Sequence, residues 1–485
     1  MNKNAAGILT NGDWGVQLSI HMAERGHDVV LYHVETEHMT NDERGAFTAA
    51  LERCSVESVC DLETFVLSIR QPRIILLVSK DTFFAESLLD GLVRMLDPED
   101  IIVDTCDTYF KTADIRIKDL EKEGIHYLPT GFSGGSEGAL HGASFMPGGR
   151  AEVYEIVKPL LADAAAEIEG FSCCPYIGPA GSGQYVKMIH NSIEYALLQV
   201  LCEAVHLLQN ALNCDSVELT EILSEWNTGE LESYMIDIVT DIAGRTDAHT
   251  GQPFLSIVLD RVSYGSSLIW MVNSAMELSY PVPILIESLN ARFLSNMMNE
   301  RIASSKLVKP PIAKSFTVLE RKMFIERLRR ALYLGYVCAY AQAFALLSRA
   351  SDLYEWNLNI PSIAKTFQGG SYIRSKLLYR VADAYETSRD LDNLFADTYF
   401  RRITDTYMSD LREVAAAAIA SGFAAPTILS AVSYIDSYRC ARLPYGMIQL
   451  VRDYIGISGY ERTDIPGIFH ADWQNPGNEL KSKRL

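Results

Sequence analysis

Short apolar runs alternate with amphipathic helical patterns along roughly the first third of the chain. Strands that are separated by helices of this length join through right-handed crossovers into a parallel, doubly wound sheet. The pattern therefore predicts an α/β domain over residues 1–180. The predicted strands are Ala5 to Leu9, Val29 to Tyr32, Ile74 to Val78, Ile101 to Asp104 and His126 to Leu128, with helices such as Val16 to Arg25, Phe84 to Met95 and Tyr109 to Glu123 between them.

The pattern changes after Gly183, where long helical stretches follow one another with almost no strand candidates. We therefore predict that residues 181–440 form a large all-α domain. Within it, residues 203–211 resemble residues 342–350, and a Trp-Asn pair follows each segment. This repeat predicts a duplicated helical unit with two equivalent central helices. Residues 441–485 contain many glycines and prolines and are predicted to form a C-terminal tail.

The first long helix of the second domain, predicted over residues 183–209, carries an unusual polar stripe. Lys187, His190, Asn191 and Glu194 are spaced at i, i+3, i+4 and i+7, which places them on one helix face. The same face is apolar over its next three turns, so the polar residues are expected to point inward at one end of a buried helix. Buried ionisable groups are costly unless they are paired or used. The stripe thus predicts a functional site, or else a helix that emerges into solvent at its start.

Composition and charge narrow the function classes. The chain has 485 residues, 48% of them hydrophobic and 22% charged, which is typical of a globular protein of two or three domains. Its net charge of −19 and the lack of a basic face argue against a nucleic-acid partner. The nine cysteines form neither a disulfide framework nor a metal-binding pattern, and we expect no metal. No signal-peptide core or membrane-length apolar run is evident, so we expect a cytoplasmic protein with no membrane partner.

A glycine-rich turn follows the first predicted strand. A dinucleotide-binding Rossmann fold has the motif G-x-G-x-x-G at this point, and residues 10–15 read Thr-Asn-Gly-Asp-Trp-Gly. Gly12 and Gly15 match the second and third glycines and are the candidate cofactor-binding residues. Thr10 replaces the first glycine, and Asp13 places a carboxylate near the expected pyrophosphate. The turn predicts a Rossmann-like fold but leaves the bound dinucleotide in question.

Several longer runs resemble the 6-phosphogluconate dehydrogenase family in one order along nearly the whole chain. The resemblance implies a Rossmann domain, a large duplicated helical domain, and a C-terminal tail that reaches into the partner subunit of a homodimer. The runs that carry it are Phe132-Ser-Gly-Gly-Ser-Glu-Gly-Ala139, Met146-Pro-Gly-Gly149, Val186-Lys-Met-Ile-His-Asn-Ser-Ile-Glu-Tyr195, Ala291-Arg-Phe-Leu294, Glu300-Arg-Ile302 and Arg452-Asp-Tyr454.

The resemblance also implies roles for individual residues. Lys187 would act as general base and then as acid, and Glu194 would be the acid that completes tautomerisation of an enol. Arg292 and Arg452 match arginines that grip the substrate phosphate, with Arg452 supplied by the neighbouring subunit, and an arginine fork suits phosphate or carboxylate equally well. The residues that would hold the sugar acid are Ser133, Gly134, Gly135, His190, Asn191, Tyr195 and Ser267.

The departures from the family pattern concentrate at two anion-binding sites. The family's Asn-Arg-Thr turn, whose Arg binds the 2′-phosphate of NADP, reads His33-Val34-Glu35 here. The family's Lys-Gly-Thr-Gly-x-Trp signature reads Gly265-Ser-Ser-Leu-Ile-Trp270, so the lysine that binds the substrate phosphate is absent. Glu35 could instead accept the ribose hydroxyls of NAD. We expect weak or no NAD(P) binding without a preference for NADP, because four acidic residues are expected to line the dinucleotide site: Asp13, Glu35, Asp81 and Asp107.

Three functional hypotheses follow. The preferred one is a repurposed homodimeric enzyme in which Lys187 and Glu194 carry out isomerisation, dehydration or decarboxylation of a hydroxy-acid-like or carbonyl substrate, anionic or polyoxygenated, with weak or no nicotinamide use. The alternative is an NAD(P)-dependent 6-phosphogluconate dehydrogenase that performs oxidative decarboxylation. The third is a non-catalytic scaffold or regulatory dimer. The retained polar stripe counts against the third hypothesis, since a disused buried face should become apolar.

Overall fold

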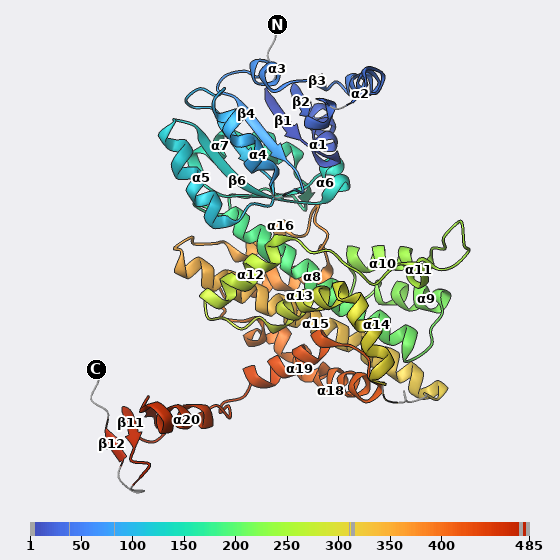
Figure 1. Ribbon diagram of the computed structural model, residues 1–485, viewed down its shortest axis with the longest axis vertical. Coiled ribbons are helices and arrows are strands. Elements are labelled where there is room, and N and C mark those ends of the chain that lie inside the picture. Colours follow the sequence, from blue (N-terminus) through green and yellow to red (C-terminus); the bar gives the residue numbers. More distant parts are fainter. Residues whose placement is uncertain are drawn as a thin grey trace. The chain divides into compact units, whose positions relative to one another are not determined.

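The structure is a computed structural model that describes residues 5–37, 39–81, 83–309, 311, 316–474 and 479–481. The chain forms two compact units, one that ends at Ala431 and one that begins at Val432 (Figure 1). The first unit contains both an α/β part and a helical part. The second unit is small and is described separately below.

The α/β part is built on a seven-stranded sheet with strand order β3-β2-β1-β4-β5-β6-β7. All neighbouring strands are parallel except β7, which is antiparallel to β6. This confirms the predicted Rossmann-like domain. The strands are β1 (Ala6–Thr10), β2 (Val29–His33), β3 (Glu57–Val59), β4 (Ile74–Val78), β5 (Ile101–Asp104), β6 (His126–Ser133) and β7 (Ser144–Pro147).

Alternating side chains of the central strands feed two hydrophobic cores, one on each face of the sheet. Ile8 and Leu76 pack in the core under α1 and α7, whereas Leu9 and Leu77 pack in the core under α3, α4 and α5. The elements that surround the sheet are α1 (Asp13–Glu24), η1 (Val34–Glu37), α2 (Asn41–Arg53), α3 (Leu62–Leu67), α4 (Phe84–Val93), α5 (Phe110–Lys122), α6 (Gly135–His141), α7 (Ala151–Ala164) and the hairpin of β8 (Glu167–Ile168) and β9 (Phe171–Ser172).

Within the seven-stranded sheet, the pattern of apolar runs did not predict two of the strands or the end of a third. β3 has one buried residue among three, so it has no apolar run to detect. β7 is four residues long and pairs antiparallel with β6, which the βα pattern does not predict. β6 was predicted to end at Leu128 but continues to Ser133, because its second half pairs with β7. The extra length of β6 brings Ser133 to the site described below.

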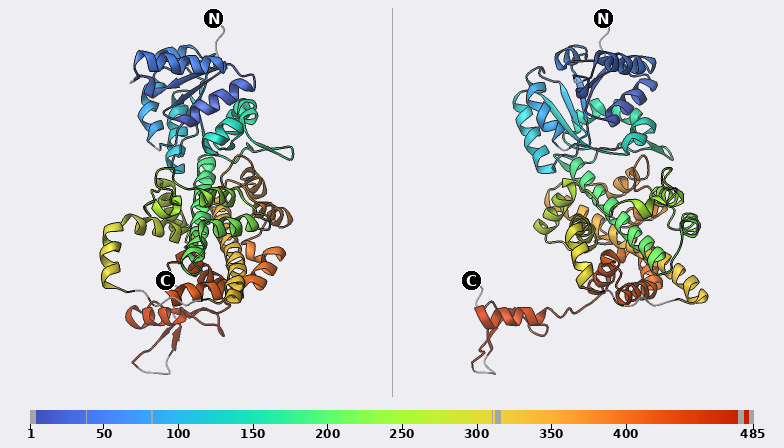
Figure 2. Two further views of the ribbon diagram at one scale, coloured as in Figure 1. Left: turned by 90° about the vertical axis from the view of Figure 1, so that its right-hand side faces the viewer. Right: turned by 45° about the vertical axis from the view of Figure 1, so that its right-hand side comes forward.

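The helical part confirms the predicted all-α class, and its two longest helices, α8 and α15, lie side by side (Figure 2). The repeated segments fall near the ends of these two helices. The helices are α8 (Ser182–Asn210), α9 (Ser216–Trp226), α10 (Tyr234–Gly244), α11 (Phe254–Ile257), α12 (Ser266–Glu277), α13 (Pro283–Asn296), α14 (Met298–Leu307), α15 (Val318–Leu353), α16 (Ile360–Thr366), α17 (Lys376–Thr387), η2 (Leu394–Ala396), α18 (Thr398–Ser421) and α19 (Pro426–Tyr438).

α15 corrects one expectation from the sequence. It is long and apolar enough to cross a membrane, although no run of this length was predicted. Its most apolar 18-residue window is 94% buried inside the protein. α15 is therefore the central helix of the hydrophobic core.

Glycines allow α8 to lie directly on the sheet. A Cβ on Gly131 of β6 would lie 2.5 Å from Lys187 Cβ, and a Cβ on Gly183 would lie 2.1 Å from Met146 O. Both distances are too short for any other residue, so these glycines are required for the close approach. The contact sets the first turns of α8 beside the ends of β6 and β7 (Figure 1).

The second unit contains α20 (Gly446–Gly456) and a three-stranded sheet of β10 (Tyr460–Glu461), β11 (Ile468–Ala471) and β12 (Glu479–Lys481). It is organised around the fully buried carboxylate of Asp453. Asp453 accepts hydrogen bonds from the backbone N–H of Gly459 (2.8 Å) and the indole N–H of Trp473 (3.0 Å), and it lies 3.0 Å from His470 Nδ1. These bonds tie the helix to the following sheet, so the tail has a defined fold of its own.

Candidate active site

The polar stripe of α8 is buried as predicted. Lys187 and Asn191 are each 7% exposed, His190 is fully buried, and Glu194 is half-buried. Every residue from Ser182 to Ile193 is buried, so the helix does not emerge into solvent at its start, and that alternative is wrong. We call Lys187, His190, Asn191, Glu194 and Ser133 the acid–base cluster.

His190 is held as a neutral imidazole at the centre of this cluster. Burial, followed by the charge of Lys187, lowers the pKa of His190 well below its usual value. His190 Nδ1 lies 3.4 Å from Asn191 Oδ1, an acceptor, which favours a proton on Nδ1. Nε2 is then an acceptor, and it lies 2.6 Å from Ser371 Oγ and 3.1 Å from Ser133 Oγ. The ring thus orients two hydroxyl groups and carries no charge of its own.

The turn after β6 closes one side of the cluster. Gly134 and Gly135 both adopt positive φ, at 130° and 58°, which favours glycine at these positions. A Cβ on Gly134 would lie 2.3 Å from Gly370 O, so the turn packs against the loop between α16 and α17. The same loop supplies Ser371 to His190. The predicted residues Ser133, Gly134 and Gly135 are therefore brought together with α8.

Asp107 lies on the opposite side of the cluster, which corrects its predicted place in the dinucleotide site. Its carboxylate accepts a hydrogen bond from Asn191 Nδ2 (3.0 Å), and Asn191 Nδ2 also lies 3.3 Å from the hydroxyl of Ser267. The pKa of Glu194 is raised, first by burial; the charge of Lys187 opposes this shift and the charge of Asp107 adds to it. Two carboxyl groups and one ammonium group therefore share this site.

A buried network below the cluster fixes the turn that carries Asp107. Asp104, at the end of β5, is fully buried and accepts hydrogen bonds from Cys106 N (3.0 Å) and the Thr108 hydroxyl (2.8 Å). Gln184 of α8 donates to the backbone oxygens of Asp104 (3.2 Å) and Cys106 (3.0 Å). Residues 104–108 are thus bonded internally and to α8, which holds Asp107 beside Asn191.

Arg292, on α13, is buried beside Tyr195 at the far end of the stripe. Its guanidinium carbon lies 4.0 Å from the centre of the Tyr195 ring, and its Nη1 donates to Ser288 O (2.7 Å). Its Nε has no hydrogen-bond partner among the residues that the structure describes. The Tyr195 hydroxyl accepts a hydrogen bond from the Gly265 N–H (3.1 Å). A buried guanidinium with an unused donor, packed against the ring of Tyr195, can hold an oxyanion of a substrate.

A cleft of about 390 Å³ lies at the carboxyl ends of β1, β2 and β4, where a Rossmann fold binds its dinucleotide. The predicted residues Gly12 and Glu35 line it, and a Cβ on Gly12 would meet nothing within 4 Å. Gly15 lies under Thr10, since a Cβ there would be 2.3 Å from Thr10 Cβ. The Thr10 hydroxyl donates to Val78 O (2.7 Å) and accepts the Gly12 N–H (3.1 Å). The turn therefore leaves space beside Gly12 for a ligand, but the Gly12 N–H is already bonded to the Thr10 hydroxyl.

The charges around this cleft are mostly negative. Asp13, Glu35 and Asp81 line it together with one lysine, Lys80. His33 is buried at its base, and burial lowers the pKa of His33 although the charges of Glu35 and Asp13 act in the opposite direction. Glu35 follows β2 and can accept ribose hydroxyls, and the described residues that line this cleft include no arginine to receive a 2′-phosphate. The rim of the cleft is therefore mostly acidic, with a carboxylate directly after β2.

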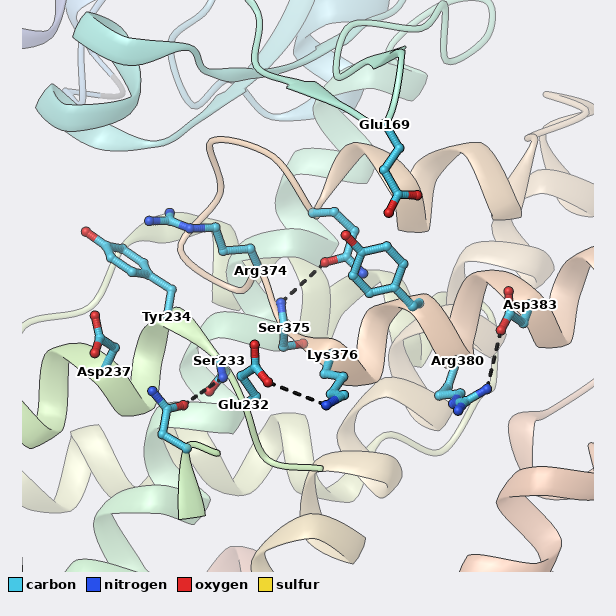
Figure 3. A pocket seen from close by; sticks show the side chains of 13 residues that line it. Glu169, Glu232, Ser233, Tyr234, Asp237, Arg374, Ser375, Lys376, Arg380 and Asp383 are labelled. Atoms are coloured by element: carbon cyan, nitrogen blue, oxygen red, sulfur yellow. Dashed lines mark hydrogen bonds and ion pairs between the residues drawn. The ribbon is translucent and has the colours of Figure 1, made fainter. Parts of the chain in front are cut away.

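A second cleft, of about 730 Å³, lies between α10, α17 and the β8–β9 hairpin (Figure 3). The Arg374 guanidinium lies 3.3 Å from the centre of the Tyr234 ring, and Lys376 forms an ion pair with Glu232 (3.5 Å). None of the predicted site residues lines it. Its neighbouring charges of both signs are typical of a solvated ionic surface rather than of a substrate site.

Two contributors to the acid–base cluster were not predicted. Ser371 and Tyr372 come from a loop about 180 residues farther along the chain than His190. The Gly369-Gly370 pair before them was the available signal, because paired glycines often mark a close backbone approach. Arg452 lies on α20 of the second unit and is exposed.

Two family profiles cover most of the chain. The profile described as the NAD binding domain of 6-phosphogluconate dehydrogenase matches residues 7–178, and the profile described as the C-terminal domain of 6-phosphogluconate dehydrogenase matches residues 183–473. The first match contains the dinucleotide-type cleft, and the second contains α8. The two matches meet close to the predicted boundary between the α/β and helical domains.

Individual relatives align over nearly their full length. The chain is 40% identical to the NADP(+)-dependent, decarboxylating 6-phosphogluconate dehydrogenase of Bacillus subtilis (strain 168) over 476 residues, 98% of this chain and 100% of the relative. It is 37% identical to an NAD(+)-dependent, decarboxylating 6-phosphogluconate dehydrogenase of the same organism over 470 residues, 97% of this chain and 99% of the relative. The solved structure of Plasmodium falciparum 6-phosphogluconate dehydrogenase matches with a TM-score of 0.90 at 28% identity, covering 97% of this chain and 100% of that one.

Proposed function

The chain belongs to the 6-phosphogluconate dehydrogenase family, and from this we propose that it is an oxidoreductase that oxidatively decarboxylates a sugar acid of the 6-phosphogluconate type. The observation that carries the proposal is the polar stripe of the acid–base cluster on one face of α8, in which Lys187, His190 and Asn191 are buried and Glu194 is half-buried. The comparisons favour this oxidative function over the repurposed enzyme and the scaffold that were considered from the sequence.

The cluster supplies a base and an acid on opposite ends of a short stripe. Lys187 takes the proton of the substrate hydroxyl and returns it to the oxygen after the carboxyl group has left as CO2. Glu194, whose pKa is raised by burial, is placed to donate a proton to the carbon of the resulting enol. Ser133 and Asn191 orient the substrate oxygens, and neutral His190 holds Ser133 in place. A nicotinamide dinucleotide, when bound, would accept the hydride whose removal oxidises the alcohol.

The cofactor that fits the cleft best is a dinucleotide without a 2′-phosphate. Glu35 stands after β2, where a carboxylate can accept both ribose hydroxyls and repels a phosphate. The relatives include one described as NAD(+)-dependent, so this preference occurs within the family. Gly12 would approach the pyrophosphate, and Gly15 lets α1 begin close to Thr10.

A redox-neutral reaction is the second candidate, favoured by two features of the dinucleotide-type cleft. Thr10 engages the Gly12 N–H internally, and Asp13, Glu35 and Asp81 surround the cleft, which weakens any pyrophosphate binding. In that case Lys187 and Glu194 would move protons on a hydroxy acid without hydride transfer.

We also propose a homodimer in which Arg452 completes the phosphate end of the neighbouring site. Arg452 is exposed on α20, and its helix presents uncovered apolar side chains, with Ile448 59% and Ile455 80% exposed. An isolated unit rarely leaves such a face exposed to water, so a partner surface is expected to cover it. The cytoplasmic location expected from the sequence stays a prediction.

The deciding experiment supplies 6-phosphogluconate with NAD, with NADP, or with neither, and measures reduced nicotinamide and released CO2. Substrate-dependent formation of NADH or NADPH together with CO2 supports the oxidoreductase. Consumption of the acid without any dinucleotide supports the redox-neutral candidate. No turnover under any condition rejects the proposed function on this substrate. Lys187→Met is the matched control, because it removes the base while keeping most of the side-chain volume.

A further inference from the structure

Tyr372 places a phenol hydroxyl on the glycine turn of the acid–base cluster. It follows Ser371 in the loop between α16 and α17 and is half-buried. A Cβ on Gly135 would lie 1.8 Å from the Tyr372 hydroxyl oxygen, so this oxygen rests directly against the Gly135 backbone. Ser371 bonds to His190 one residue earlier, which fixes the loop on which Tyr372 stands.

The hydroxyl is a hydrogen-bond donor that lies near a carboxyl group. Burial, and then the charge of Glu194, raises the pKa of Tyr372, so the phenol keeps its proton at neutral pH. The hydroxyl makes no hydrogen bond to another residue that the structure describes, and it is not a fully buried atom, so a molecule outside the protein can reach it. A donor without a protein partner, set against the Gly135 backbone at the edge of a cluster that orients oxygens, is available to a ligand that enters the site.

We propose that Tyr372 is a specificity-determining residue of the active site, whose hydroxyl donates a hydrogen bond to a substrate oxygen held between Gly135 and Glu194. The inference rests on the proposed function in one respect, namely that the substrate is a polyoxygenated acid. Lys187 and Asn191 contact the substrate from α8, and Tyr372 contacts it from the loop facing that helix. A site that pairs a polar group with a substrate hydroxyl discriminates strongly against analogues that lack the hydroxyl.

The proposal gives Tyr372 a role different from that of the nearby tyrosines. Tyr195 is half-buried, and its hydroxyl is already used by the Gly265 N–H. Tyr379 is 42% exposed and lines the second cleft, on α17. Tyr379 is therefore a matched control, because Tyr379→Phe removes an equivalent hydroxyl outside the active site.

The test measures the dissociation constants of 6-phosphogluconate and gluconate by titration calorimetry for the wild type, Tyr372→Phe and Tyr379→Phe. Phe keeps the ring and removes only the hydroxyl, so a purely structural ring would leave binding unchanged. We expect Tyr372→Phe to weaken binding of at least one acid about fivefold to tenfold, the loss typical of one hydrogen bond. Tyr379→Phe is expected to match the wild type. Tyr372→Met, which also lacks the hydroxyl, must show the same weakening and serves if the Phe variant folds poorly.

The outcomes separate this inference from the proposed function. Unchanged binding in Tyr372→Phe overturns the role of Tyr372, whatever the wild type catalyses. Weaker binding in Tyr372→Phe, with a wild type that binds the acid but forms no reduced nicotinamide, supports Tyr372 and rejects the oxidoreductase. A wild type that binds neither acid rejects both.

Discussion

A lysine at position 265 is expected to strengthen binding of a phosphorylated substrate. Family members place a lysine here by resemblance, and this chain has Gly265 at the N-cap of α12. The backbone has φ −87° and ψ 159°, an extended conformation that any residue adopts. A Cβ would lie 3.6 Å from Ser267 Oγ and 3.8 Å from the Tyr195 hydroxyl, which are ordinary contacts. Gly265→Lys should therefore fold normally and add an ammonium group at the end of the site where Arg292 lies.

The size of the effect follows from a balance of two terms. Two unit charges about 4 Å apart attract by about 4 kcal/mol at the effective dielectric constant of a protein surface. Ordering a lysine side chain costs about 1.5 to 2 kcal/mol, and the loss of a favourable N-cap residue affects Gly265→Lys and the Gly265→Met control alike. About 2 kcal/mol remains, which corresponds to roughly 30-fold tighter binding. Solvent screening reduces it, so we expect a tenfold to 30-fold lower KM for 6-phosphogluconate.

The assay compares 6-phosphogluconate with unphosphorylated gluconate in the wild type, Gly265→Lys and Gly265→Met. The Met variant has a similar length and the same N-cap change but no charge. The gain should be confined to Gly265→Lys with the phosphorylated acid, and it should shrink as salt rises above physiological strength, where the screening length falls below about 8 Å. An equal gain in Gly265→Met, or an equal gain for gluconate, would show that no phosphate binds near this position.

Four further predictions follow from the site and the tail. Lys187→Met should lower kcat at least about 100-fold while circular dichroism and the oligomeric state stay unchanged; retained turnover would remove the catalytic role. Folding raises the pKa of Glu194, so the stability of the wild type falls as pH rises through that pKa. The melting temperature of Glu194→Gln, relative to that of the wild type, should therefore increase from pH 4 to pH 8. A difference in melting temperature that does not depend on pH would contradict this. The double variant Val34→Arg and Glu35→Thr should tighten NADP binding about tenfold more than NAD binding, as measured by fluorescence titration. Equal increases in affinity for the two dinucleotides would show that the ribose binds elsewhere. Sedimentation should show a dimer at micromolar concentration, and Arg452→Ala should raise KM without dissociating it; a monomeric wild type would contradict the shared site.

The periodicity of α8 predicted the acid–base cluster because helix geometry depends on local spacing alone. Lys187, His190, Asn191 and Glu194 occupy one face at any position of the helix in the protein. Their burial could be inferred as well, since the same face continues as an apolar stripe. The alternation of apolar runs likewise predicted the central strands of the sheet, and it missed the short β3, the antiparallel β7 and the second half of β6.

The remaining walls of the site could not be read from spacing, because they are set by long-range contacts. Asp107 was expected among the acids of the dinucleotide cleft, but the bonds of Asp104 and Gln184 turn it toward Asn191. Tyr372 reaches the cluster only because Gly134 and Gly135 admit its loop. Such contacts depend on how separate elements pack, and no local pattern in one sequence encodes that packing.

The positions at which this chain departs from the family pattern also indicate which part of the chemistry the departures affect. Lys187 and His190 lie in close contact with β6 and with the loop of Ser371, so a substitution there would disturb packing as well as catalysis. Glu35 and Asp13 are exposed at the rim of the cleft, where a change of charge costs the fold little and alters only what binds. Under the proposed function, the proton chemistry rests on Lys187 and the half-buried Glu194, whereas the acidic residues at the rim bear on which dinucleotide or substrate phosphate binds.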